Sequence, residues 1–198
     1  MKTIRLMPMT GALLALVMAG CSNDSTTSAQ FAGSATPPAP GLIKLSLAST
    51  SGTQVLVNVL LFGPEPALDL NAITFAIKIS DPSAVRFVPQ TTYVQSALVA
   101  GEGQRVAIDV DGASDPSLVN VQIAKLGGGA GNGFTSPSAV VIQLSFEVVG
   151  SGGAALSFSG VGRSPARALD SAGRTIDDVI FDTQGASIAA VTTGGGGY

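Results

Sequence analysis

The chain has 198 residues, a formal net charge of −3, a single cysteine and neither histidine nor tryptophan. Without histidine it has no Ser-His-Asp triad and no histidine metal site, and one cysteine leaves no internal disulfide. The mildly acidic balance disfavours nucleic acid as a partner, because phosphate backbones attract clusters of lysine and arginine.

The first 20 residues have the pattern of an export signal. They begin with two cations, continue with an apolar segment over residues 6–18 and end with small residues before Cys21. The apolar segment is shorter than the roughly 20 residues that a membrane-spanning helix needs. We therefore expect this signal to be removed from the mature protein.

The end of the signal, Val-Met-Ala-Gly-Cys at residues 17–21, resembles the bacterial lipobox. The resemblance implies cleavage between Gly20 and Cys21, a diacylglyceryl group on the Cys21 sulfur and a further acyl chain on the new amino group. Several acyl chains hold a protein durably at a membrane. In lipoproteins, a residue such as Ser22 after the lipidated cysteine favours the outer membrane over the inner one. We expect a lipid anchor at the bacterial cell envelope; the alternative is an ordinary secretory signal that releases the protein.

Residues 21–41 begin with the lipidated cysteine and are otherwise almost entirely small or polar, with three prolines near the end. Such a segment buries too little apolar area to offset the entropy of ordering. We predict a flexible tether that holds a domain clear of the membrane. The predicted domain covers residues 42–192, and residues 193–198 form a disordered glycine-rich tail.

Between residues 42 and 192, apolar side chains alternate with polar ones in short runs that end at Gly, Pro, Asn, Asp or Ser. A period of two is typical of β-strands with one buried face. The clearest runs lie at 43–47, 55–62, 73–80 and 142–148. We predict an all-β domain of about nine strands, packed as a two-layer antiparallel sandwich.

Two segments between the predicted strands need separate interpretation. Residues 93–99 fit either an extended connection or one helical turn. Residues 127–133 form a glycine-rich loop after a strand, which is one feature of a phosphate cradle. No helix start follows this loop, so we expect a hairpin connection between strands instead.

Residues 75–87 combine an alternating strand, an Asp-Pro turn and an apolar-x-Phe strand, and this combination resembles the cohesin family. The segments 119–124, 141–148 and 169–176 resemble later parts of the cohesin pattern in the same order. The resemblance extends over residues 42–191. It implies the nine-stranded jelly-roll sandwich that cohesins share with the carbohydrate-binding-module superfamily. Typical cohesins bind a dockerin module that tethers polysaccharide-degrading enzymes, so the resemblance implies a protein partner.

Without histidine, carboxylates are the main candidates for catalytic acids and bases. Asp177 and Asp178 are neighbours, and successive side chains of a strand point to opposite faces, so the two are poorly placed to act as a pair. A glycosidase assembled from distant carboxylates stays open, but the sequence offers no aromatic lining for sugar subsites. We therefore expect a protein that is not an enzyme.

Three carboxylates, Asp109, Asp111 and Asp115, lie close together in the sequence and are candidate ligands for calcium. An EF-hand counted from Asp109 would need an oxygen ligand at position 113 and glycine at 114, where the chain has alanine and serine. Two interpretations remain, a structural calcium ion at an irregular loop site or a cluster of Asp-Gly and Asp-Pro turns.

We expect the domain to bind a protein through one face of a sheet. Small and polar side chains suit such a face. The side chains that we expect there are Ala76, Asn120, Gln122, Ala124 and Ser145. The leading alternative is a carbohydrate-binding module, and a third hypothesis is a purely structural envelope lipoprotein.

Carbohydrate-binding faces usually stack sugars on exposed aromatic rings, and this chain has few such rings. Its only tyrosines are Tyr93 and Tyr198. Four of its eight phenylalanines fall at alternating strand positions, which indicates a place in the core. The candidate exposed rings are Phe31, Phe134 and Tyr93, too few for a flat stacking platform.

Overall fold

The computed structural model describes residues 26–127, 129–131, 133–160 and 165–193. The export signal, the cleavage point at Gly20, the predicted lipidation site at Cys21 and residues 194–198 of the predicted tail lie outside these ranges. Within them the regular structure is entirely β, and no helix is long and apolar enough to cross a membrane.

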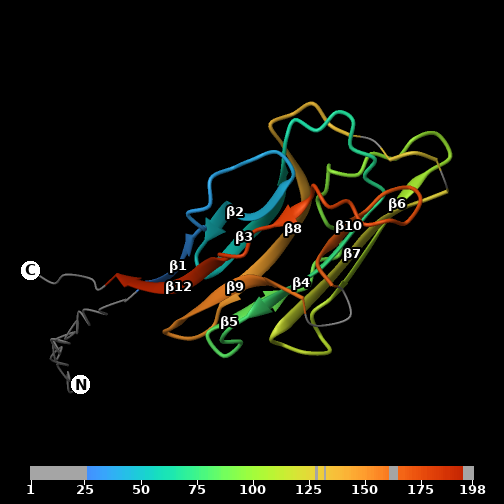
Figure 1. Cartoon of the computed structure of the whole chain (residues 1–198). Coiled ribbons are helices and arrows are strands. Elements are labelled where there is room, and N and C mark those ends of the chain that lie inside the picture. Colours follow the sequence, from blue (N-terminus) through green and yellow to red (C-terminus); the bar gives the residue numbers. More distant parts are fainter. Residues whose placement is uncertain (1–25, 128, 132, 161–164, 194–198) are drawn as a thin grey trace, which may run out of the picture.

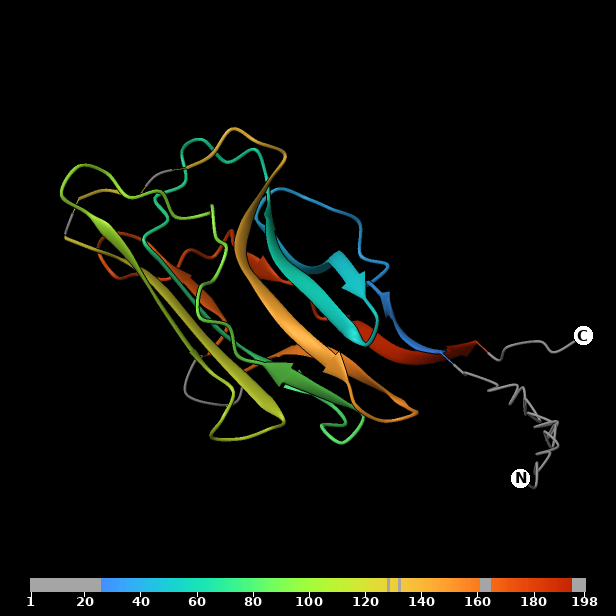
Figure 2. The same cartoon turned by 180° about the vertical axis from the view of Figure 1, so that it is seen from behind.

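Twelve strands of the described residues form two sheets that pack face to face (Figures 1 and 2). The larger sheet has the order β1-β12-β9-β4-β7-β6, and the short β10 also pairs with β4. Its strands are β1 (Thr26–Ala32), β12 (Ala186–Thr193), β9 (Gly153–Ser159), β4 (Ala72–Ile79), β7 (Leu118–Leu126), β6 (Arg105–Asp111) and β10 (Arg167–Leu169). The smaller sheet consists, in spatial order, of β11 (Ile180–Phe181), β2 (Leu42–Ser51), β3 (Gln54–Phe62), β8 (Ser138–Val148) and β5 (Val85–Val88).

The pairing confirms the predicted all-β antiparallel sandwich. Every strand pair is antiparallel except β11 with β2, which is parallel. The strand number exceeds the predicted nine partly because β1 and β10 were not expected. Strand β10 has only three residues, which is too few for an alternating pattern to be visible.

Alternate residues of β4 and β8 form the centre of the core. Phe75 and Ile77 of β4 and Phe146 of β8 are completely buried, as the period of two predicts. The Phe75 ring lies 5.6 Å from that of Phe158 in the same sheet and 6.1 Å from that of Phe181 in the other sheet. Burial of each fully enclosed phenylalanine contributes about 1.5–3 kcal/mol, so this aromatic contact helps to hold the two sheets together.

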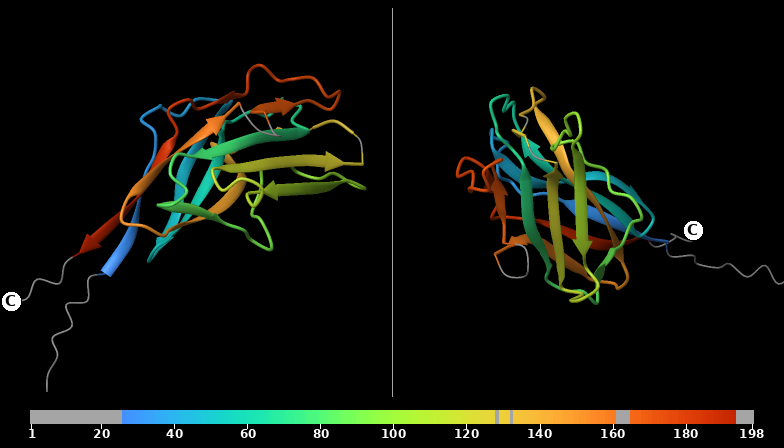
Figure 3. Two further views of the ribbon diagram at one scale, coloured as in Figure 1. Left: turned by 90° about the horizontal axis from the view of Figure 1, so that it is seen from below. Right: turned by 90° about the vertical axis from the view of Figure 1, so that its right-hand side faces the viewer.

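The prediction of a flexible tether over residues 21–41 is wrong for its described part. Residues 26–32 form β1, which pairs with β12 along its whole length (Figure 3, left). Ala29 is buried and Phe31 packs against the core, while Gln30 between them is exposed. The composition of this strand does not distinguish it from a linker, because Ser, Thr and Ala in an alternating pattern also suit a β-strand at the edge of a sheet.

The rest of the predicted tether is held by Asp182, a buried carboxylate after β11. Asp182 accepts hydrogen bonds from the hydroxyl of Ser34, from Thr36 Oγ1 at 2.8 Å and from the backbone N–H of Gln184 at 3.0 Å. Lys44 Nζ donates to the carbonyl oxygen of Ser34 at 2.9 Å. Burial alone raises the pKa of Asp182, but these hydrogen bonds outweigh it and lower the pKa below its ordinary value.

The structure shows which interpretation holds for residues 93–99 and for residues 127–133. The backbone N–H groups of Ser96 and Ala97 donate to the carbonyl oxygen of Val140, so this segment is an extended connection along β8 and not a helical turn. The glycine-rich loop 127–133 joins β7 of the larger sheet to β8 of the smaller one. It is therefore a crossover between the sheets, and the prediction of a hairpin is wrong.

We predict that Asp182→Asn lowers the free energy of unfolding at pH 7 by about 1–3 kcal/mol, because the amide cannot replace all the hydrogen bonds of the carboxylate. The lowered pKa means that the ionised Asp182 stabilises the fold above its ordinary pKa of 3.8 and that this contribution is lost as the pH falls through the folded-state pKa. Urea denaturation at pH 7 and pH 3 measures both effects. The exposed Asp109→Asn is the control, and an equal loss for Asp182→Asn at the two pH values would contradict the prediction.

Candidate functional site

Four of the five predicted binding residues lie together on the outer face of the larger sheet. We define this outer face as the side chains of β9, β4, β7 and β6 that point away from the core; β4, β7 and β6 lie side by side in Figure 3, right. Ala76 lies opposite Asn120, while Gln122 and Ala124 follow on the same side of β7. Ser145 belongs to β8 of the smaller sheet, so its assignment to this face is wrong.

The side chains at the centre of the outer face are small and mostly uncharged. Ala76 is completely buried between its strand neighbours Asn120 and Ser159. Asn120 Oδ1 is also buried and has no hydrogen-bond partner among the described residues. A hollow of about 240 Å³ opens beside these residues and is lined by Lys78, Ser117, Leu118 and Ser159. The face thus offers a shallow depression with an apolar side chain, hydroxyls and one cation.

Two of the three candidate calcium ligands, Asp111 and Asp115, accept hydrogen bonds from the turns that follow them. Asp111 accepts hydrogen bonds from the N–H of Ala113 at 3.1 Å and from Ser114 Oγ at 2.7 Å. Asp115 accepts from both the N–H and the Oγ of Ser117, which lower the pKa of Asp115. Asp109 lies exposed on β6. In the described part of the chain, no three His, Cys, Asp or Glu side chains are grouped to hold a metal ion.

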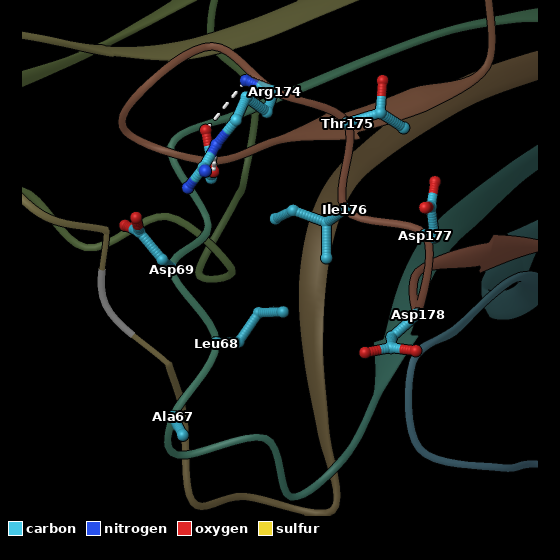
Figure 4. Close-up of a pocket in the computed structure, with 9 residues that line it drawn as sticks. Ala67, Leu68, Asp69, Arg174, Thr175, Ile176, Asp177 and Asp178 are labelled. Atoms are coloured by element: carbon cyan, nitrogen blue, oxygen red, sulfur yellow. Dashed lines mark hydrogen bonds and ion pairs between the residues drawn. The ribbon is translucent and has the colours of Figure 1, made fainter.

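A larger pocket of about 610 Å³ opens between the β3–β4 connection and the segment after β10 (Figure 4). It is lined by Ala67, Leu68, Asp69, Asp170, Arg174, Thr175, Ile176, Asp177 and Asp178, and we call it the end pocket. The sequence alone does not indicate this pocket, because its two walls are about 100 residues apart in the chain. No local pattern of residues indicates such a distant pairing.

Two carboxylates of the end pocket are held by donors from the chain itself. Asp69 accepts hydrogen bonds from Ser171 Oγ at 2.6 Å and from the N–H groups of Ser171 and Gly131. Asp170 accepts from the N–H of Arg174 at 2.8 Å and forms an ion pair with its Nε, also at 2.8 Å. These contacts hold the pKa values of both carboxyls below their ordinary value.

The resolved pKa shifts do not suit glycosidase chemistry. A glycosidase needs one carboxyl with a raised pKa to donate a proton to the leaving group. The carboxyls of Asp69, Asp81, Asp115, Asp170 and Asp182 each have a lowered pKa. Asp177 and Asp178 are exposed in a turn before β11, where a strand was expected.

The glycine-rich crossover packs tightly on the β3–β4 connection. A Cβ atom on Gly131 would come within 2.5 Å of the backbone of Asp69 and Leu70, so only glycine fits there. The Gly131 N–H donates to Asp69 and is thus engaged by a carboxylate of the chain. This use of the Gly131 N–H argues against the phosphate cradle.

Lys125 occupies a position of β7 that faces the core, in line with the buried Val121 and Ile123. Only 5% of the residue is exposed, and its Nζ has no hydrogen-bond partner among the described residues. Burial lowers the pKa of Lys125, while the negative charge of Asp69 acts in the opposite direction. An unpaired buried ammonium is costly, so Lys125 is a local weakness of the core.

Aromatic side chains do not form a platform for sugars in the described part of the chain. The three candidate exposed rings, Phe31, Phe134 and Tyr93, are all partly buried and pack against the core. None of the other described phenylalanines is exposed either. The outer face therefore lacks the stacking surface that most polysaccharide-binding faces use.

Sequence comparisons find no matching family model and no matching curated protein. Solved structures do match the fold. A type II cohesin domain from the cellulosome of Acetivibrio cellulolyticus aligns over 77% of this chain and 95% of its own length, with 13% identity and a TM-score of 0.51. The fold is cohesin-like.

Two further solved structures are type II cohesins as well. A cohesin dyad from the adaptor ScaA scaffoldin of Acetivibrio cellulolyticus matches over 75% of this chain with 14% identity and a TM-score of 0.49. The chain spans about half of that dyad, at 48%. Cohesin A11 from Bacteroides cellulosolvens matches over 73% of this chain and 97% of its own length, with 9% identity and a TM-score of 0.48. The match at a TM-score of 0.51 confirms the cohesin-like sandwich that the resemblance implied.

We predict that Lys125→Met stabilises the cohesin-like domain by about 1–2 kcal/mol at pH 7, because methionine fills a similar volume without a buried charge. The lowered folded-state pKa of Lys125 means that the cost of its charge is relieved as the pH rises toward 10.5, so the advantage of methionine shrinks there. Urea denaturation at pH 7 and pH 10 tests this, with the exposed Lys78→Met as control. A loss of stability of Lys125→Met at pH 7 would contradict the prediction, because it would show that other groups of the protein stabilise the charged ammonium.

Proposed function

We propose that the chain is a lipid-anchored, non-catalytic module of the bacterial cell envelope that binds a protein partner through the outer face. The observation that carries this proposal is the centre of the outer face, where the polar side chains of Asn120 and Gln122 lie beside the buried Ala76 and a hollow of about 240 Å³. A dockerin module is the first partner to test, because the fold is cohesin-like and the matching domain with a TM-score of 0.51 comes from a cellulosome.

The outer face suits a protein better than a polysaccharide. Protein interfaces need complementary shape and paired polar groups, and they need no row of exposed rings. The exposed Gln122 and Lys78 supply polar groups on this face that a docked protein can pair with. The absence of an exposed ring among the described aromatic residues argues against sugar stacking.

The proposed anchor rests on the lipobox-like residues that end at Cys21. Because β1 begins at Thr26, only residues 22–25 separate the lipidated residue from the sandwich. Four fully extended residues span at most about 14 Å. The module then lies close to the membrane surface, and the proposed stalk is much shorter than a 20-residue tether.

We expect Cys21→Ser to convert the protein from a membrane-bound form into a soluble one, because serine cannot form the thioether to diacylglycerol. Phase separation in Triton X-114 and labelling with radioactive palmitate measure the change. The unsubstituted chain should partition into detergent and incorporate label, and the variant should do neither. Ser22→Ala is the control and should keep both properties. An unlabelled native chain in the aqueous phase would support the secretory alternative.

We expect Gln122→Arg to weaken binding of the protein partner at least tenfold, because it places a long cation in the middle of the outer face. The partner is captured on the immobilised protein, identified, produced separately and titrated by calorimetry. Ser49→Arg on β2 introduces the same charge into the other sheet and should bind like the unsubstituted chain. Equal affinity for both variants would contradict the assigned face, and saturable binding to a polysaccharide without a protein partner would favour the glycan-binding alternative.

A further inference from the structure

The end pocket has a different chemistry from the outer face, and only its orientation relative to the membrane rests on the proposed function. We infer that the end pocket is a docking point for an arginine side chain of a partner protein. Three features of the pocket favour this occupant: an aliphatic floor, exposed carboxylates on the rim and a position at one end of the sandwich.

The floor of the pocket is aliphatic. Leu68 comes from the β3–β4 connection and Ile176 from the segment after β10, and their side chains point toward one another across the pocket (Figure 4). Both residues are partly buried and pack against the core. A long basic side chain can lay its methylene groups on such a surface and keep its charged head at the rim.

The rim carries uncompensated negative charge. Asp177 and Asp178 are exposed on one side of the pocket, and neither carboxylate has a hydrogen bond or ion pair within the described residues. Asp69 lies on the opposite side and stays ionised because donors from the chain lower its pKa. The cation on the rim, Arg174, is already paired with Asp170. The buried Lys125 is close enough to Asp69 to interact with its charge, but it is not part of the pocket lining.

The negative charge of the rim and the aliphatic floor together favour an arginine side chain as the occupant of the pocket. A metal ion would need several carboxylates around one point, and the described carboxylates form no such group. A guanidinium is planar and pairs with carboxylates through two parallel hydrogen bonds, and its three-carbon stem matches the aliphatic floor. The pocket has room for an arginine together with part of the chain that carries it.

The position of the pocket makes it accessible to a second protein. Both ribbon views place the β3–β4 connection at the end of the sandwich away from the start of β1 (Figures 1 and 2). The proposed lipid anchor precedes β1, so the pocket opens on the side of the module that is remote from the membrane. A protein in the surrounding compartment can reach it without contact with lipid.

The probe for this inference is the peptide acetyl-Ala-Arg-Ala-amide, titrated into the ¹⁵N-labelled chain carrying Cys21→Ser. The matched probe has citrulline, which keeps the shape of arginine without its charge. We expect saturable shifts of the backbone amides of Leu68, Ile176 and Asp178 with the arginine peptide and at least tenfold weaker binding of the citrulline peptide.

The matched variants separate a local effect from net charge. Asp177→Asn with Asp178→Asn should weaken binding of the arginine peptide at least tenfold. Asp109→Asn with Glu102→Gln removes the same charge from exposed positions elsewhere and should leave binding unchanged. Gln122→Arg on the outer face should also leave it unchanged, so failure of this inference can be told apart from failure of the proposed function.

Three outcomes would overturn the inference: equal binding of the two peptides, undiminished binding to the variant lacking both carboxylates, or tighter binding of spermidine than of the arginine peptide. The last outcome would assign the pocket to free polyamines instead of a protein. Dispersed amide spectra of each variant establish that a loss of binding does not come from unfolding.

Discussion

Alternating burial along β4 and β8 is the constraint on which the rest of the molecule depends. Phe75 and Ile77 must face Phe146 across the core, and a slip of one residue would turn every side chain of β4 to the other face. The same alternation directs Thr74 and Lys78 away from the core, and of these Lys78 is exposed. The outer face is therefore a direct consequence of core packing, because the residues that can contact a partner are those that alternate with the buried ones.

Buried or hydrogen-bonded carboxylates hold the connections at the ends of the sandwich. Asp182 holds the segment after β1 through hydrogen bonds from Ser34 and Thr36. Asp69 joins the glycine-rich crossover to the segment after β10 through hydrogen bonds from Gly131 and Ser171. A chain with a single cysteine has no internal disulfide for this purpose. Each such carboxylate satisfies two or three donors at once, so loops that are distant in sequence become neighbours at a small number of points. The end pocket exists because two of these loops are fixed in this way.

The sequence predicted the parts of the fold that are encoded locally. The runs around Phe75 and Phe146 showed their period of two because each strand has one buried and one outer face, and the mixed polar content of β7 indicated which of its side chains face outward. What it did not predict depends on distant pairing. The strand at Thr26 is stabilised by its partner β12, which begins 160 residues later, and its own composition resembles a linker. Ser145 lies in an alternating run just as Asn120 does, but no local pattern indicates to which sheet a strand belongs. The end pocket was missed for the same reason, since Asp69 and Ser171 meet only through the closed sandwich.

The position of β1 restricts how a partner can approach the outer face. Strand β1 is the edge of the same sheet that carries this face, and it is separated from β4 by β12 and β9. With neighbouring strands about 4.8 Å apart, β4 lies about 14 Å across the sheet from β1. The proposed anchor adds at most about 14 Å of extended chain before Thr26, so the outer face stays within a few nanometres of the membrane. A bulky partner anchored elsewhere must therefore bring its docking segment on a linker of its own, whereas a partner that reaches the end pocket approaches from the opposite end of the sandwich and meets no such restriction.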